Sequence, residues 1–129
     1  MNKILVEVSV GELLDKISIL EIKKEKIKDK DNLSYINDEY SSLKKQLENN
    51  IKIDEKLQNL FASLKEVNNN LWNIENEKRL YEKNKDFSEK FIKTSREIHF
   101  LNDKRSKIKL EINLITKSKI KEIKEYTKY

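Results

Sequence analysis

Two of the three arginines in this chain lie among polar side chains that interrupt apolar helical patterns. Arg79 follows Glu75 by four residues, and Arg105 precedes Lys109 by four. Residues spaced three or four apart lie on one face of a helix. A guanidinium group is planar and permanently charged, so it recognises carboxylates and phosphates in a geometry that lysine cannot copy. Since lysine is by far the commoner base here, the two arginines point to recognition of an anion.

The candidate binding residues come from three separate stretches of the chain. We expect a helical bundle to bring them together around a polar cavity in which the basic groups bind an anion or phosphate, Glu75 orients them and Trp72 forms a wall. A purely structural alternative is that Arg105 pairs with Glu75 while Trp72 belongs to the core. Catalytic residues cannot be named. The candidate ligand-binding residues are Lys16, Trp72, Glu75, Arg79, Asn102, Arg105 and Lys109.

Several kinds of chemistry are excluded by composition. The chain contains no cysteine, so disulfides, thiolate metal sites and a cysteine nucleophile are ruled out. His99 is the only histidine, which rules out a multi-histidine zinc site. We therefore expect no metal and no cofactor, and we interpret His99 as an ordinary, partly exposed residue.

The charge of the chain gives little support to nucleic-acid binding. The net charge is +5, from 28 basic and 23 acidic residues. Most lysines alternate with glutamates along the expected helices, a pattern typical of a solvated face. Binding of single-stranded nucleic acid needs basic residues gathered together with aromatic ones. We therefore expect no nucleic-acid partner.

The sequence contains no segment typical of membrane insertion or secretion. The apolar run near the start is interrupted by Glu7 and lacks the small-residue cleavage site of a signal peptide. No stretch approaches the roughly 18 apolar residues that a membrane-spanning helix needs. These features predict a cytoplasmic protein without a membrane span.

The composition and local signals predict an all-α fold. Glycine occurs once, at Gly11, and proline is absent, whereas sheets need such residues at their turns. Ser9 and Glu12 have the spacing of a capping box, and apolar residues then recur at steps of three and four. We expect a first helix over about 10–28 and a second that begins after a cap at Asp31 or Asn32 and ends at about residue 50.

The longest apolar patterns predict a coiled-coil-like hairpin. Residues of about 54–84 and 86–115 carry heptad-like stripes, and the connection between them is so short that the two helices must run antiparallel. Asp86 and Glu89 have the spacing of a second helix cap. Two shorter N-terminal helices pack on this hairpin, and part of it projects, which a second copy of the chain could cover. The whole chain, residues 1–129, is then one domain.

The two ends of the chain are less regular. Residues 3–8 alternate loosely and could form an extended arm over the bundle or a disordered start. After a polar interruption at 116–118, Ile120 and Ile123 predict a last amphipathic turn or two that ends at Tyr126.

Several motifs resemble a small bacterial family of uncharacterised proteins, a domain of unknown function. The opening segment 5–23, LVEVSVGELLDKISILEIK, is the most specific of them. The resemblance implies a helical protein of about 120–130 residues whose members are associated with surface-polysaccharide and glycosyltransferase genes, and it assigns no activity. The other motifs are Leu71-Trp72-x-Ile74-Glu75 with Arg79, Asp86-Phe87 with Phe91, and Asn102-Asp103-x-Arg105 with Lys109, Ile112 and Asn113.

Two functions remain open at this point. The first is a non-enzymatic interaction or accessory protein, linked to surface-glycan assembly, whose partner is another protein or a second copy of the chain. The second is a protein that binds a small anionic ligand, or an enzyme with a cationic pocket that acts by electrostatic stabilisation. The sequence names neither the ligand nor a reaction.

Overall fold

The computed structural model describes residues 2–129 and contains four α-helices. They are α1 (Val10–Lys26), α2 (Lys30–Asn50), α3 (Glu55–Lys83) and α4 (Glu89–Ile115). No strand occurs within residues 2–129, and the all-α prediction is confirmed. In the same part of the chain, no helix is both long and apolar enough to cross a membrane.

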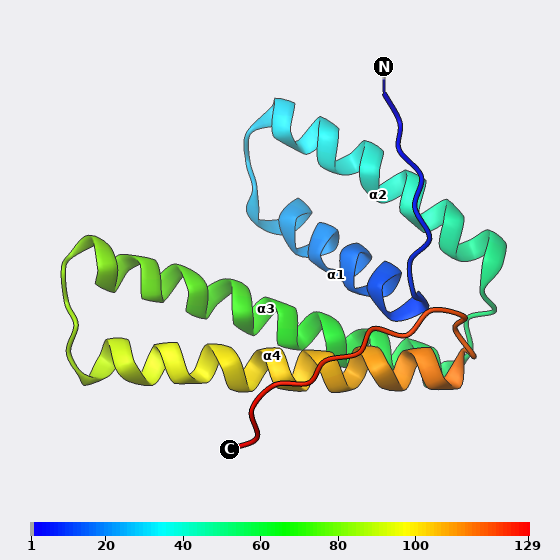
Figure 1. Cartoon of the computed structure of the whole chain (residues 1–129). Coiled ribbons are helices and arrows are strands. Elements are labelled where there is room, and N and C mark those ends of the chain that lie inside the picture. Colours follow the sequence, from blue (N-terminus) through cyan, green and yellow to red (C-terminus); the bar gives the residue numbers. More distant parts are fainter. Residues whose placement is uncertain (1) are drawn as a thin grey trace.

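The helix α1 lies at the centre of the arrangement. The two long helices, α3 and α4, lie side by side, and α1 packs against both of them (Figure 1). The helix α2 packs on α1, so it joins the bundle chiefly through that helix. The end of the α3–α4 pair that carries their connection extends past α1 and α2 (Figure 1).

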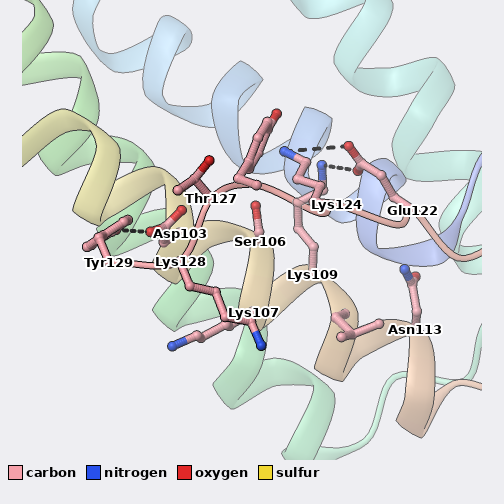
Figure 2. A pocket seen from close by; sticks show the side chains of 12 residues that line it. Asp103, Ser106, Lys107, Lys109, Asn113, Glu122, Lys124, Thr127, Lys128 and Tyr129 are labelled. Atoms are coloured by element: carbon pink, nitrogen blue, oxygen red, sulfur yellow. Dashed lines mark hydrogen bonds and ion pairs between the residues drawn. The ribbon is translucent and has the colours of Figure 1, made fainter.

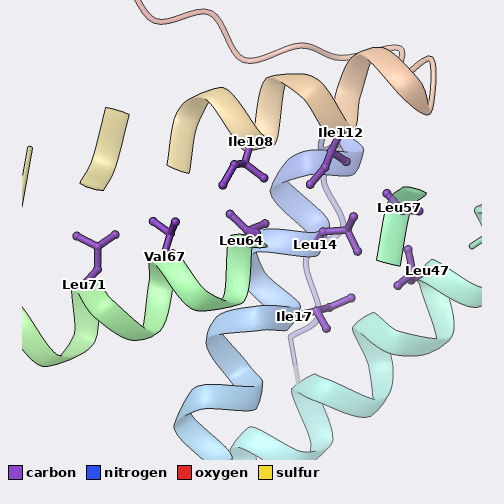
Figure 3. Packing of buried hydrophobic residues seen from close by; sticks show 9 residues of the cluster. All are labelled: Leu14, Ile17, Leu47, Leu57, Leu64, Val67, Leu71, Ile108 and Ile112. Carbon is purple, nitrogen blue, oxygen red and sulfur yellow. The ribbon is translucent and has the colours of Figure 1, made fainter. Parts of the chain in front are cut away.

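The core is built from one apolar stripe on each helix. The apolar residues recur every three or four positions, which places their side chains on a single face of each helix, directed towards the interior. Leu47 of α2 joins this core near Leu57 at the start of α3 (Figure 3). The buried cluster consists of Leu14, Ile17, Leu47, Leu57, Leu64, Val67, Leu71, Ile108 and Ile112.

The helix starts agree only in part with the capping signals. The Ser9 hydroxyl accepts a hydrogen bond of 3.0 Å from the backbone N–H of Glu12, as expected for the cap of α1. The cap of α2 is Asp29, whose side chain accepts from the N–H of Asn32. The predicted caps Asp31 and Asn32 lie inside the helix instead, because Asp29 already satisfies the free N–H group of its first turn. The first helix ends at Lys26, two residues earlier than predicted.

The connection between α3 and α4 also differs from the prediction. Asp86 was expected to cap α4 together with Glu89, but Ser88 precedes the helix and makes no capping bond through its side chain. The Asp86 carboxylate accepts instead from the backbone N–H of Ser88 at 3.1 Å. Such a bond to a residue two positions on stabilises a turn. Lys85, with φ of 53°, completes the tight reversal.

The C-terminal segment is not helical, contrary to the predicted amphipathic turns at Ile120 and Ile123. Residues 118–129 instead run back along α4 without regular structure (Figure 1). Lys117, with φ of 54°, turns the chain at the end of α4. A helix of one or two turns gains too few hydrogen bonds to offset its nucleation. The segment finds partners on the bundle instead, including a hydrogen bond from the backbone N–H of Val10 to the Ser118 hydroxyl.

The N-terminal arm does not cover the bundle. Residues 2–8 have no regular structure, and Ile4 and Leu5 are 83% and 81% exposed. The alternation of apolar residues in this arm therefore does not reflect packing on the helices.

Gly11 sets the distance between α1 and α4. A β-carbon at this position would lie 2.5 Å from the backbone carbonyl oxygen of Lys109. The Gly11 N–H donates to the side-chain oxygen of Asn113 at 2.7 Å. Only glycine allows both the close approach and this hydrogen bond, so the single glycine of the chain marks the point where the two helices cross.

We expect Gly11→Ala to lower the free energy of unfolding by about 2 kcal/mol, because the added carbon forces the two helices apart. The loss should appear although alanine is the better helix former by about 1 kcal/mol. Urea unfolding measures it, and Ser63→Ala at an exposed site of α3 serves as the control, with an expected change within about 0.5 kcal/mol. A Gly11→Ala protein as stable as the wild type would contradict this account of the crossing.

Candidate functional site

A groove between α1, α3 and α4 collects most of the residues that the sequence singles out. It has a volume of about 330 Å³. Of the seven candidates, Lys16 lies outside it, exposed on α1, and Lys109 lies further along α4 beside a different cavity. The candidates that line the groove are Trp72, Glu75, Arg79, Asn102 and Arg105, and Ile19, Ile22, Asn68, Leu71 and Asn76 complete its walls.

Arg105 is held by Asp15 of α1. Its Nε donates to Asp15 Oδ1 at 2.9 Å, and one terminal nitrogen donates to Oδ2, which gives a two-point contact. The Asp15 side chain is 1% exposed and that of Arg105 is 29% exposed. The alternative in which Arg105 pairs with Glu75 is therefore wrong. Glu75 and Arg105 both line the groove, but the guanidinium group of Arg105 is paired with the buried carboxylate of Asp15.

The buried carboxylate of Asp15 receives further hydrogen bonds from the surrounding helices. The side-chain amide of Asn68 on α3 donates to Asp15 Oδ1 at 2.8 Å and to the Ser18 hydroxyl at 2.7 Å. The Ser18 hydroxyl in turn donates to the backbone carbonyl of Asp15. A buried charge is tolerated when it is paired and hydrogen-bonded in this way. The network joins α1, α3 and α4 at one point.

Lys109 lies on the other side of Asp15 and is also buried, at 6% exposure. Its ammonium group contacts Glu12 at 2.7 Å and Glu122 at 2.9 Å, and it lies 3.9 Å from Asp15. Figure 2 shows Glu122 reaching Lys109 from the C-terminal segment, next to a cavity of about 550 Å³ between this segment and α4. Lys109 therefore belongs to an ion-pair network and does not face the groove.

The network keeps Asp15, Arg105 and Lys109 ionised at neutral pH. Burial raises the pKa of Asp15, but hydrogen bonds from Arg105 and Asn68 and the charges of Arg105 and Lys109 outweigh it, so the pKa lies below its usual value. The hydrogen bonds to Asp15 raise the pKa of Arg105. Burial lowers the pKa of Lys109, yet its bonds to Glu12 and Glu122 leave it raised overall. None of these groups is poised to exchange a proton near pH 7.

The groove itself offers two charged groups without an ion-pair partner. Within residues 2–129, neither Glu75 nor Arg79 forms an ion pair, and Arg79 is exposed. Trp72 is half-buried beside them. Asp15 balances Arg105, so the groove as a whole is near charge balance. It can bind an acidic group at the arginines and a hydrogen-bond donor at Glu75.

The described residues, 2–129, contain no group of three or more His, Asp or Glu side chains that could hold a metal ion. His99 is exposed on α4 and packs against the rings of Phe100 and Tyr129. It does not line the groove.

Five residues of the network were not among the candidate binding residues. Besides Glu12, which contacts Lys109, they are Asp15 and Glu122, which contact Arg105 or Lys109 directly, and Ser18 and Asn68, which bond to Asp15 or to each other. The sequence held a signal for Asp15 and Ser18. Asp15 and Ser18 are three residues apart among the apolar positions of the first helix, which indicates a polar pair on a buried face. Glu122 carried no such signal, because the residues after α4 were expected to be helical.

The model of a family of unknown function, DUF6165, matches residues 4–129, and the chain therefore belongs to this family. The resemblance to an uncharacterised family is thereby confirmed. No curated protein and no solved structure matches the chain.

The buried pair predicts a specific pH dependence. Because the pKa of Asp15 is lowered in the folded protein, its contribution is complete above the unfolded value of about 3.9 and is lost as the pH falls through the folded value. We expect Asp15→Asn to cost about 3 kcal/mol at pH 7. The difference from the wild type should shrink below about pH 4.

Urea unfolding at pH 7, 5, 4 and 3 measures this difference. Asp38→Asn, at an exposed position of α2, is the matched control and should stay within about 0.5 kcal/mol of the wild type. A cost of Asp15→Asn that is the same at every pH would show that the carboxylate charge is not what stabilises the crossing.

Proposed function

We propose that this member of the DUF6165 family is a non-enzymatic accessory protein that binds a small polar ligand with an acidic group in the groove between α1, α3 and α4. The observation that carries the proposal is the convergence of Trp72, Arg79 and Arg105 on one groove from two helices. These residues are spread over more than thirty positions of the sequence. Their meeting in one place, with Arg105 fixed by Asp15, favours a binding site over scattered surface charges.

The two arginines suit an acidic group for different reasons. Arg105 uses two of its five N–H groups on Asp15, so the guanidinium is held in one orientation with donors left over. A group already fixed in its binding geometry loses little entropy when a ligand arrives. Arg79 is exposed and forms no ion pair within the described residues, so its guanidinium is available to a ligand. Together they supply one rigid and one adaptable partner for a carboxylate or phosphate.

The remaining residues restrict the ligand further. The carboxylate of Glu75 accepts hydrogen bonds, so the ligand must carry hydroxyl or amino donors as well as its acidic group. Trp72 presents an apolar ring against which a flat or cyclic part of the ligand can pack. The volume of about 330 Å³ is at the small end of the range of about 300–1,000 Å³ found for small-molecule sites.

The same groove gives less support to catalysis. General acid–base catalysis needs a group whose pKa lies near the working pH, whereas Asp15 is held ionised by its partners. Catalysis by electrostatic stabilisation alone needs an excess of one charge, and Asp15 and Glu75 offset the two arginines. A role in binding without turnover fits this balance better.

The cellular setting belongs to the proposal as well. We place the protein in the cytoplasm and link it to surface-glycan assembly, which is what the family resemblance implies. Sugar phosphates and nucleotide sugars carry an acidic group, hydroxyl donors and a ring, so they meet the three requirements of the groove.

A second candidate function is protein binding through the free end of the α3–α4 pair, which we propose acts as a projecting antiparallel hairpin. Leu80, Phe87 and Ile92 are 57%, 57% and 55% exposed there, beyond the reach of α1 and α2 (Figure 1). Phe87 packs edge-on against Phe91, with ring centroids 5.4 Å apart. Aromatic residues are enriched at the centres of protein interfaces, and a second copy of the chain is the simplest occupant.

A thermal-shift screen tests the groove. The ligands are phosphate, sulfate, sugar phosphates, nucleotide sugars, chorismate and short RNA. A ligand at about 100 times its Kd stabilises the fold by about 2.7 kcal/mol, which raises Tm by several degrees for a domain of this size. We expect Arg79→Ala to remove the shift without lowering the Tm of the free protein, because this exposed side chain makes no ion pair in residues 2–129.

Arg96→Ala, which removes an exposed arginine of α4 outside the groove, is the control and should keep the shift. A shift that survives in Arg79→Ala would place the ligand elsewhere. A flat screen would contradict small-ligand binding for these compounds, and sedimentation velocity with Leu80→Ser/Phe87→Ser/Ile92→Ser would then decide whether the free end pairs with a second copy.

A further inference from the structure

A continuous series of charged contacts joins the C-terminal segment to the groove. Glu122 of this segment contacts Lys109, Lys109 lies beside Asp15, and Asp15 holds Arg105, which lines the groove. Figure 2 shows the first of these contacts, with the second oxygen of Glu122 directed to Lys124 at 3.6 Å. The series links a segment without regular structure to a residue of the proposed binding site.

Lys109 and Arg105 face the same oxygen of Asp15. Arg105 is hydrogen-bonded to Oδ2, whereas the Lys109 ammonium is 3.9 Å from that oxygen, beyond hydrogen-bond distance. Glu12 and Glu122 hold Lys109 in this position from the other side, at 2.7 Å and 2.9 Å. Loss of Glu122 would leave the buried ammonium with Glu12 as its one close carboxylate, and Asp15, at 3.9 Å, is the next carboxylate within reach.

We infer that Glu122 is a positioning residue for the groove: it holds Lys109 away from Asp15 and so reserves the Asp15 carboxylate for Arg105. When the C-terminal segment is docked, Arg105 is fixed and the groove is organised for its ligand. When the segment leaves, Lys109 shifts towards Asp15, shares it with Arg105 and loosens the guanidinium. The consequence for ligand affinity rests on the proposed function, whereas the effect on Arg105 does not.

The attachment of the segment suits a regulated contact. The Glu122 side chain is 42% exposed whereas that of Lys109 is 7% exposed, so the partner on the C-terminal segment is the one that water can reach. The other anchors are the Ser118 hydroxyl near the start of α1 and Tyr129, whose ring packs on His99 and whose hydroxyl donates to Asp103. The segment makes no helix of its own, so it can be released without unfolding the bundle.

Nuclear magnetic resonance of the free protein tests this inference. The Nε–H of Arg105 gives its own signal, and its exchange with water reports how firmly Asp15 holds it. We expect Glu122→Gln to speed this exchange about fivefold, as expected for loss of an interaction of this kind. Glu125→Gln is the control because Glu125 is on the same segment but forms no ion pair within residues 2–129.

An exchange rate that is the same in both variants and the wild type would overturn the inference. A second comparison separates this effect from a general loss of rigidity. In Lys109→Gln the competing ammonium is absent, so adding Glu122→Gln should not change the exchange rate of the Arg105 Nε–H any further. An additional effect there would mean that Glu122 acts by another route. Since no ligand is added, the outcome is independent of the ligand screen.

Discussion

The burial of the Asp15 carboxylate at the meeting point of α1, α3 and α4 is the constraint on which the rest of the structure depends. Removing a carboxylate from water costs several kcal/mol unless charged and hydrogen-bonding partners replace the water. Arg105 and Asn68 provide those partners from α4 and α3, and Lys109 adds a nearby charge. The position of α1 on the long helices is thereby restricted to the one that satisfies Asp15. The apolar stripes alone would tolerate a range of positions.

The same interaction shapes the groove. Ile19 and Ile22 follow Asp15 on α1 and form one wall, so the groove exists only when α1 is docked. Gly11 allows the close approach that this docking requires. Arg105 then has two roles at once, because it neutralises a buried charge and presents its remaining donors to the groove. The stability of the fold and the organisation of the site are therefore not separable at this residue.

Much of the fold follows from periodicity, while the partners of the polar residues do not. Apolar residues that recur every three or four positions predicted the four helices. Arg105 interrupts one of these apolar stripes, which indicated that its guanidinium needs an anionic partner. Spacing along one helix does not say which residue faces it across the interface, so Glu75 was assigned in place of Asp15. Lys16 was among the candidate binding residues, yet its side chain is exposed to solvent. The amphipathic pattern of residues 120–126 predicted helical turns that do not form, because so short a helix is unstable by itself.

The most direct test of this account is a double-mutant cycle between Asp15 and Arg105, measured by urea unfolding at pH 7. The variants are Asp15→Asn, Arg105→Gln and the two combined. If the pair organises the crossing, the combined change should cost much less than the sum of the single changes, with a coupling energy of about 2 kcal/mol. Costs that add to within about 0.5 kcal/mol would contradict the account, because they would mean that neither side chain depends on the other.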